Sequence, residues 1–176
     1  MKLSAKLICY HLQKSFPMDT SRLDTEPTLL CPACYEKNTP LQEGRVYLIT
    51  DPDFQPTFHH PKNILFLMIG KIYQNYELTQ PNMCVIPEDF PANTIFNKLQ
   101  EIFILYDRWN QSLMDSRLRN ASIQELLDLT ASIIPNPMML IGMDFTIIAS
   151  RGWDLGDLSN SVLGSNENSW AVVDSL

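Results

Sequence analysis

The cysteine pair Cys31 and Cys34 is the arrangement in this chain closest to a chemical site. Two cysteines separated by two residues have the spacing of half a zinc-binding knuckle, and His59, His60 and Cys84 are of the types that coordinate zinc. No second C-x-x-C and no H-x-x-x-H follows in the sequence. We therefore expect no metal and no other cofactor, with Cys31, Cys34, His59 and His60 as the ligand candidates should a metal bind.

The same cysteines allow a redox interpretation. A C-x-x-C pair at a helix N-terminus acquires a lowered thiol pKa, but Pro32 and the residues after Cys34 do not predict a helix there. Packing of both thiols as small hydrophobic groups at a strand end is the simpler alternative. The His59–His60 pair lies in a proline-flanked loop, where it is either solvated or senses a ligand or pH.

Other catalytic motifs are absent from the sequence. It contains no G-x-S-x-G, no G-x-x-x-x-G-K, no G-x-G-x-x-G and no H-E-x-x-H. We therefore predict that the protein is not an enzyme. The alternative that stays open is a metal- or thiol-dependent small-molecule-binding protein or enzyme that uses Cys31, Cys34 and the nearby histidines.

The net charge of the chain and the length of its apolar runs argue against nucleic acids and membranes as binding partners. The 176 residues carry 13 basic and 20 acidic side chains, a net charge of −7, which does not favour binding to a phosphate backbone. The N-terminus lacks the features of a signal peptide, and the longest apolar run, 64–69, is far shorter than the ~20 residues that cross a bilayer. We predict a cytoplasmic protein with no direct nucleic-acid or membrane contact.

The first half of the chain predicts an α/β fold. Apolar residues at helical spacing indicate an amphipathic helix over 3–13, which Pro17 ends. Four short apolar runs separated by turn-rich segments predict strands at 28–31, 46–50, 64–69 and 83–86, and the uniformly apolar third run is typical of a strand covered on both faces. We expect a small, mostly parallel α/β sensory domain over 1–89.

A long helix follows, from Pro91 to about Arg119. Apolar side chains recur at spacings of three and four, the pattern of a helix that packs along another helix. We predict a dimerising, coiled-coil-like linker over 90–121. Its predicted dimer interface consists of Ile95, Leu99, Ile102, Tyr106, Trp109 and Leu113.

The last third begins with a second helix. Ser122 and Glu125 form an S-x-x-E capping box, and Pro135 and Pro137 end the helix that follows. Two β-rich runs around a Gly-Met-Asp turn then predict a hairpin over 138–150. The segment 122–176 therefore reads as the start of an incomplete second domain.

Residues 94–152, which include SIQELLDL and the Asn136-Pro137 turn, resemble the middle region of PucR-type regulators, the purine-catabolism class of bacterial transcriptional regulators. The runs VYLITDPDF and NILFLMIG resemble the amino-terminal α/β domain of that family more loosely. The resemblance implies an amino-terminal sensory region, a coiled linker and a GAF- or PAS-like α+β domain whose first hairpin is 138–150.

In that family a helix-turn-helix that binds DNA lies at the carboxyl end, and residues 153–176 do not resemble it. The expected function is therefore ligand sensing and dimerisation within a bacterial transcriptional regulator, as a homodimer that responds to a small-molecule effector. A dimerisation adaptor without a ligand is a further alternative.

Overall fold

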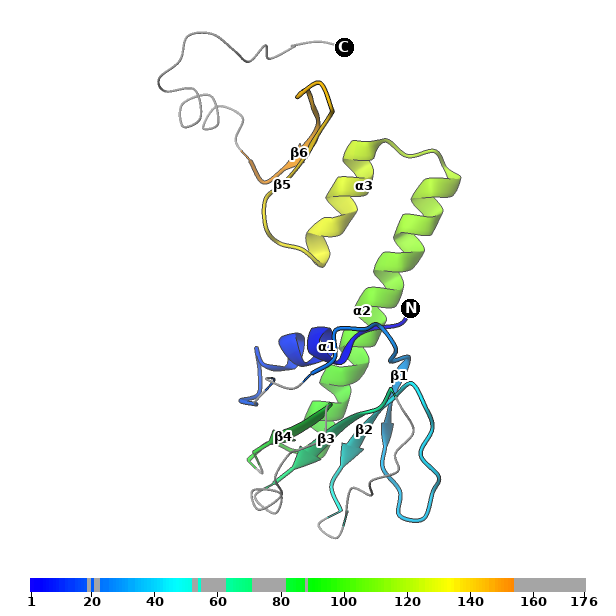
Figure 1. Cartoon of the computed structure of the whole chain (residues 1–176), viewed down its shortest axis with the longest axis vertical. Helices are drawn as coiled ribbons and strands as arrows, with labels where there is room; N and C mark the ends of the chain where they lie inside the picture. Colours follow the sequence, from blue (N-terminus) through cyan, green and yellow to red (C-terminus); the bar gives the residue numbers. More distant parts are fainter. Residues whose placement is uncertain are drawn as a thin grey trace. The chain divides into compact units, whose positions relative to one another are not determined.

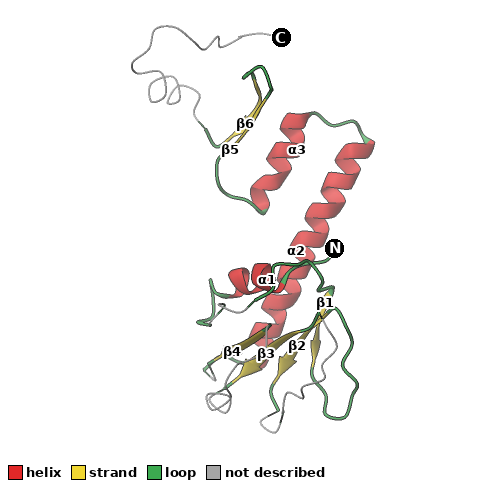
Figure 2. Ribbon diagram, viewed as in Figure 1, coloured by secondary structure: helices red, strands yellow, loops and turns green. Residues whose placement is uncertain are grey.

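The structure is a computed structural model that describes residues 1–18, 20, 23–51, 54, 63–70, 82–87 and 89–153. The chain divides into two compact units, Met1–Asp107 and Arg108–Leu176, which we describe separately. The boundary between them lies inside the long helix. Figures 1 and 2 show the elements and the residues described.

The first unit is built on a four-stranded sheet of β1 (Cys31–Cys34), β2 (Arg45–Ile49), β3 (Leu65–Ile69) and β4 (Met83–Ile86). The strands lie in the order β1-β2-β3-β4, and every neighbouring pair is parallel (Figure 1). The predicted α/β class and parallel sheet are confirmed. The connections over 52–53, 55–62 and 71–81 lie outside the described residues.

The first strand differs from the prediction. It was expected over 28–31, whereas β1 comprises Cys31–Cys34, and Leu29 instead forms an isolated antiparallel bridge with Leu3. Pro32 cannot donate a hydrogen bond to the ladder of the sheet. It is tolerated here because β1 is an edge strand of the described sheet, where it pairs with β2.

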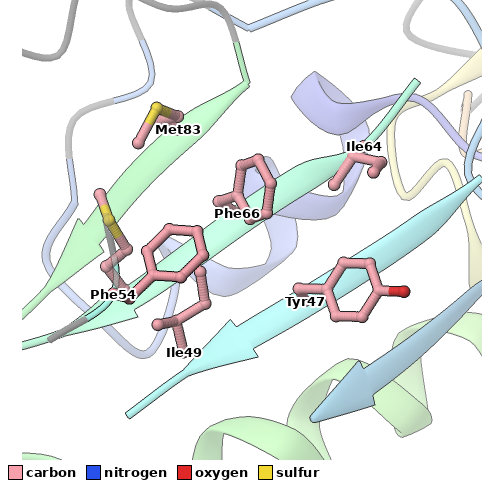
Figure 3. Packing of buried hydrophobic residues seen from close by; sticks show 7 residues of the cluster. Tyr47, Ile49, Phe54, Ile64, Phe66 and Met83 are labelled. Atoms are coloured by element: carbon pink, nitrogen blue, oxygen red, sulfur yellow. The ribbon is translucent and has the colours of Figure 1, made fainter. Parts of the chain in front are cut away.

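One face of the sheet carries a cluster of aromatic and aliphatic side chains. Strand alternation directs Tyr47 and Ile49 of β2, and Phe66 and Met68 of β3, to this face. Figure 3 shows Tyr47, Ile49 and Phe66 beside Met83, Ile64 and Phe54, and Met68 belongs to the same cluster. The rings of Tyr47 and Phe66 stack with centroids 6.3 Å apart, so the strands are held together by cross-strand packing as well as by hydrogen bonds.

The opposite face is equally apolar and is covered by α1 (Ala5–Leu12). Leu48, Leu67 and Cys84 are buried on this face at matching registers of their strands. The Cys9 sulfur of α1 lies 3.7 Å from that of Cys84, which places the helix against β4. The predicted N-terminal helix is confirmed, and Ser4 caps it by accepting a hydrogen bond from the Leu7 amide.

The long helix α2 comprises Ala92–Leu118, 27 residues, as its periodicity predicts. Its first half belongs to the first unit and its last turns to the second. Ile95, Leu99, Ile102 and Tyr106 are between 0% and 3% exposed, so this part of the helix is a core element of the sheet unit.

The second unit continues with α3 (Ile123–Leu129), the short 3₁₀ helix η2 (Thr130–Ser132) and a hairpin of β5 (Met138–Ile141) and β6 (Ile147–Arg151). The capping box is present, with Ser122 and Glu125 bonding to each other's backbone amides. The strands are antiparallel, with an irregularity at Leu140 and Ile141, so the predicted hairpin is confirmed.

Among the described residues no helix combines the length and the apolar character that a membrane crossing needs.

Candidate functional site

The carboxyl edge of the parallel sheet is the usual place for a ligand in an α/β fold. Ligands bind there where the strand order reverses, because the reversal sends neighbouring connections to opposite faces and opens a crevice. The order β1-β2-β3-β4 has no reversal. A ligand at this edge would therefore be held by the connecting segments, of which the structure describes 35–44 in full and parts of the others, among them Asp51, Phe54 and Gly70.

Cys31 and Cys34 lie at the two ends of β1. Residues three apart in a strand point to opposite faces of the sheet and are ~10 Å apart along the backbone. Two sulfurs that share a tetrahedral zinc ion each lie only ~2.3 Å from the metal. The strand therefore separates the two thiols and does not bring them together as a chelating or redox pair.

Each of these cysteines has a distinct environment. The Arg45 Nη1 group donates to the Cys31 sulfur at 2.7 Å, across the register that pairs these residues on β1 and β2. Cys34 is exposed on the other face, so the expectation that both thiols pack as small hydrophobic groups is wrong for Cys34.

The two histidine candidates, His59 and His60, lie outside the described residues. Within the part of the chain that is described, no group of three or more histidine, cysteine, aspartate or glutamate side chains is arranged to hold a metal ion.

The close thiol pair in this chain is Cys9 with Cys84, which the spacing in sequence did not reveal. Both side chains are buried, and neither cysteine is in a disulfide. The hydrogen bond with Cys84, together with burial, raises the pKa of the Cys9 thiol far above its ordinary value. A thiol held neutral is a poor nucleophile, so this pair acts as core packing between α1 and β4.

A polar contact within the first unit joins α1 to α2. The His11 Nε2 atom and the Tyr106 hydroxyl share a hydrogen bond at 2.8 Å, and the two rings meet edge to face. Burial, followed by the positive charges of Lys14 and Lys98, lowers the pKa of His11. Next along the helix, the Asp107 carboxylate accepts a hydrogen bond from the amino terminus of Met1.

The predicted dimer interface on α2 needs correction. Four of its six residues, Ile95, Leu99, Ile102 and Tyr106, are buried inside the sheet unit and are not available to a second chain. The three-four spacing that suggested a coiled coil is in this stretch the pattern of a helix packed on its own domain, because both arrangements bury one stripe. Trp109 and Leu113 continue the stripe in the second unit and are half-buried.

In the part of the second unit that the structure describes, polar contacts connect the helix α3 to the hairpin. The Gln124 side chain donates to the Ser150 carbonyl at 2.9 Å and accepts from the Ser150 amide at 3.2 Å, which fixes α3 beside β6. The Arg151 guanidinium donates to the carbonyls of Ile134 and Asn136. Ala149 is the buried residue of the described hairpin strands.

The hairpin presents apolar side chains to solvent. The large apolar residues that are exposed on it are Leu140, Ile141, Met143, Phe145, Ile147 and Ile148. A two-stranded hairpin is at best marginally stable by itself, and apolar side chains of this one are exposed even with α3 beside β6. It therefore gains stability from further packing.

Comparison of the chain with protein-family models, with curated proteins and with solved structures finds no match.

Proposed function

We propose that this chain is the ligand-sensing and dimerisation region of a bacterial transcriptional regulator of the PucR type, without a DNA-binding helix-turn-helix of its own. One observation carries the proposal: α2 is a single helix whose first half is core to the sheet unit and whose last turns belong to the second unit. A helix shared in this way couples the two units mechanically.

The sheet unit is the proposed sensor. Ile95 and Leu99 hold α2 in a close-packed core, and close packing does not deform continuously. A small molecule that binds one packing arrangement of this unit better than another therefore shifts the preferred position of α2. The second unit receives that shift through the helix and passes it to the parts of the regulator that contact DNA.

The net charge and the cysteine environments support the rest of the proposal. With a net charge of −7 the chain repels a phosphate backbone, so the region acts on DNA through a partner domain. It works in the cytoplasm, where its cysteines, none of which is in a disulfide, stay reduced. The separation of Cys31 from Cys34 in β1, and the neutral Cys9 thiol, support sensing rather than thiol catalysis.

The second unit is, in this proposal, the beginning of a GAF- or PAS-like domain. Its hairpin over Met138–Ile141 and Ile147–Arg151 supplies two antiparallel strands with apolar residues exposed. Such a pair gains stability when further strands or helices cover its faces.

A fusion assay tests the proposal. The chain is joined to a helix-turn-helix domain that binds its operator only as a dimer, and repression of a reporter is measured with and without hypoxanthine, guanine or urate. We expect repression that exceeds that of the DNA-binding domain alone and that changes with at least one purine. Repression equal to the control, and unchanged by any of the three, would refute the proposal.

A metal measurement separates the proposal from the metal- or thiol-dependent alternative. Protein purified without chelator should contain far less than one zinc per chain. A stoichiometric zinc content that falls in a Cys31→Ala variant would overturn the sensor proposal in favour of that alternative.

A further inference from the structure

Cys9 of α1 and Cys84 of β4 bring two thiols into contact, although 75 residues separate them in the sequence. Their sulfur atoms lie 3.7 Å apart and share a hydrogen bond, and the two residues are 0% and 1% exposed. Cys9 lies on the buried face of α1 with Ile8 and Leu12, and Cys84 is paired with Leu67 of β3. The fold of the sheet unit therefore holds two oxidisable groups together that the proposed function does not use.

We propose that Cys9 and Cys84 are a redox-sensitive pair, which a hydroperoxide oxidises to a disulfide that ties α1 to β4 and which cellular thiols reduce again. The inference does not depend on the proposed function. Disulfides that form in the cytosol are usually transient and serve catalysis or redox sensing. A disulfide bond is about 2.05 Å long, so the two sulfurs need to approach each other by roughly 1.7 Å.

The helix α1 is the element that has to move for an oxidant to reach the pair. It has 8 residues, and a helix shorter than about 12–15 residues is marginal in water without tertiary packing. We therefore expect α1 to leave the sheet locally at a lower free-energy cost than unfolding of the whole unit. Opening of α1 exposes both thiols to the oxidant, whereas in the closed state burial protects them.

The reaction balances with hydrogen peroxide as the two-electron oxidant. In the open state one thiol loses its proton, and its sulfur attacks an oxygen of the peroxide. The O–O bond breaks, one oxygen leaves as water, and a sulfenic acid forms. The sulfur of the other cysteine then attacks the sulfenic sulfur. The S–S bond forms, the S–O bond breaks, and the second oxygen leaves as water with the proton of the second thiol.

The disulfide changes the stability of the sheet unit and the freedom of α1. It closes a loop of 75 residues, which constrains the unfolded chain and favours the folded unit. It also prevents α1 from leaving β4. Because His11 of α1 shares a hydrogen bond with Tyr106 of α2, the oxidised form holds the helix that contacts α2 within this unit.

The test uses the whole chain with Cys31→Ser and Cys34→Ser, which leaves Cys9 and Cys84 as its thiols. The protein is treated with hydrogen peroxide well below its Tm and digested with trypsin without a reductant. We expect the peptides that carry Cys9 and Cys84 to be joined, and to separate on addition of dithiothreitol. The wild type should give the same joined peptides, which keeps the test valid if the double variant does not fold.

The Tm shows whether the native packing accommodates the bond. Oxidation should raise the Tm by about 5 °C or more and slow the hydrogen exchange of the α1 amides, and dithiothreitol should reverse both changes. Adding Cys84→Ser to the double variant gives the control, which has one thiol in each chain. Peroxide should not raise its Tm, even though it oxidises the same methionines.

Several results would overturn this inference while the sensor proposal stands. Peroxide could leave both thiols reduced, carry them to sulfinic acid without a disulfide, or join cysteines of two different chains. A bond between Cys9 and Cys84 that leaves the Tm unchanged or lowers it would show that the native unit does not accommodate the disulfide.

Discussion

Replacing Leu99 by alanine tests whether the predicted interface stripe belongs to the core of the chain's own sheet unit. Leu99 is 0% exposed, and truncating a fully buried leucine costs about 2–5 kcal/mol through lost burial and the cavity left behind. Leu118→Ala is the matched control on the same helix, because the same side chain is 83% exposed there. The control should change the free energy of unfolding by no more than about 0.5 kcal/mol.

The expected loss is large for a unit of this size. Each 1 kcal/mol lowers the Tm of a domain of about 100 residues by roughly 4–8 °C, so Leu99→Ala should lower it by about 10 °C or more. Urea unfolding followed by circular dichroism at 222 nm gives the free energy directly. The measurement is made at two protein concentrations, because a residue in a dimer interface gives a concentration-dependent stability and a core residue does not.

Two results would refute this reasoning. Equal destabilisation by Leu99→Ala and Leu118→Ala would mean that the two faces of α2 are equally buried in solution. A loss at Leu99 that disappears as the protein concentration rises would return the residue to the intermolecular interface that the sequence suggested.

Three further predictions follow from local contacts. Burial and nearby lysines lower the pKa of His11 from its ordinary value of 6.5, so the folded state resists protonation of this side chain. The protein therefore loses stability as the pH falls below 6.5. Between pH 7.5 and 5.5 the Tm of the wild type should drop more than the Tm of His11→Gln. Ser122→Ala removes the capping box of α3 and should destabilise the second unit by about 1 kcal/mol in urea unfolding, whereas Ser122→Asp, which retains a capping oxygen, should not. In thiol titration of the native protein, exposed Cys34 should react first, and Cys9 and Cys84 only at the rate of local unfolding; prompt labelling of Cys9 would contradict the buried thiol pair.

The predicted interface on α2 shows what helical periodicity cannot specify. Apolar residues at spacings of three and four predict that one face of a helix is covered, but they do not predict which surface covers it. Ile95 and Leu99 satisfy the pattern by packing inside the sheet unit. Met114 and Leu118 lie outside this stripe and are exposed.

The cysteine candidates show the same limit for a chemical motif. The spacing C-x-x-C fixes the number of residues between the two cysteines. The distance between their sulfur atoms depends on the local backbone conformation. In a turn, two such sulfurs meet at one metal, but in the extended strand β1 they point to opposite faces. The pair that does meet, Cys9 and Cys84, is brought together by the packing of α1 on β4, over a separation of 75 residues.

The sequence by itself determined the local elements of this protein. Short-range periodicity and capping placed α1, three of the four strands, the full length of α2, the Ser122 capping box and the hairpin, because each depends on side chains within a few residues of one another. The tertiary structure alone decided which thiols meet, what covers the apolar stripe of α2 and where the two units divide. Those properties depend on contacts between residues far apart in the chain, and no local pattern specifies the partner of an apolar face.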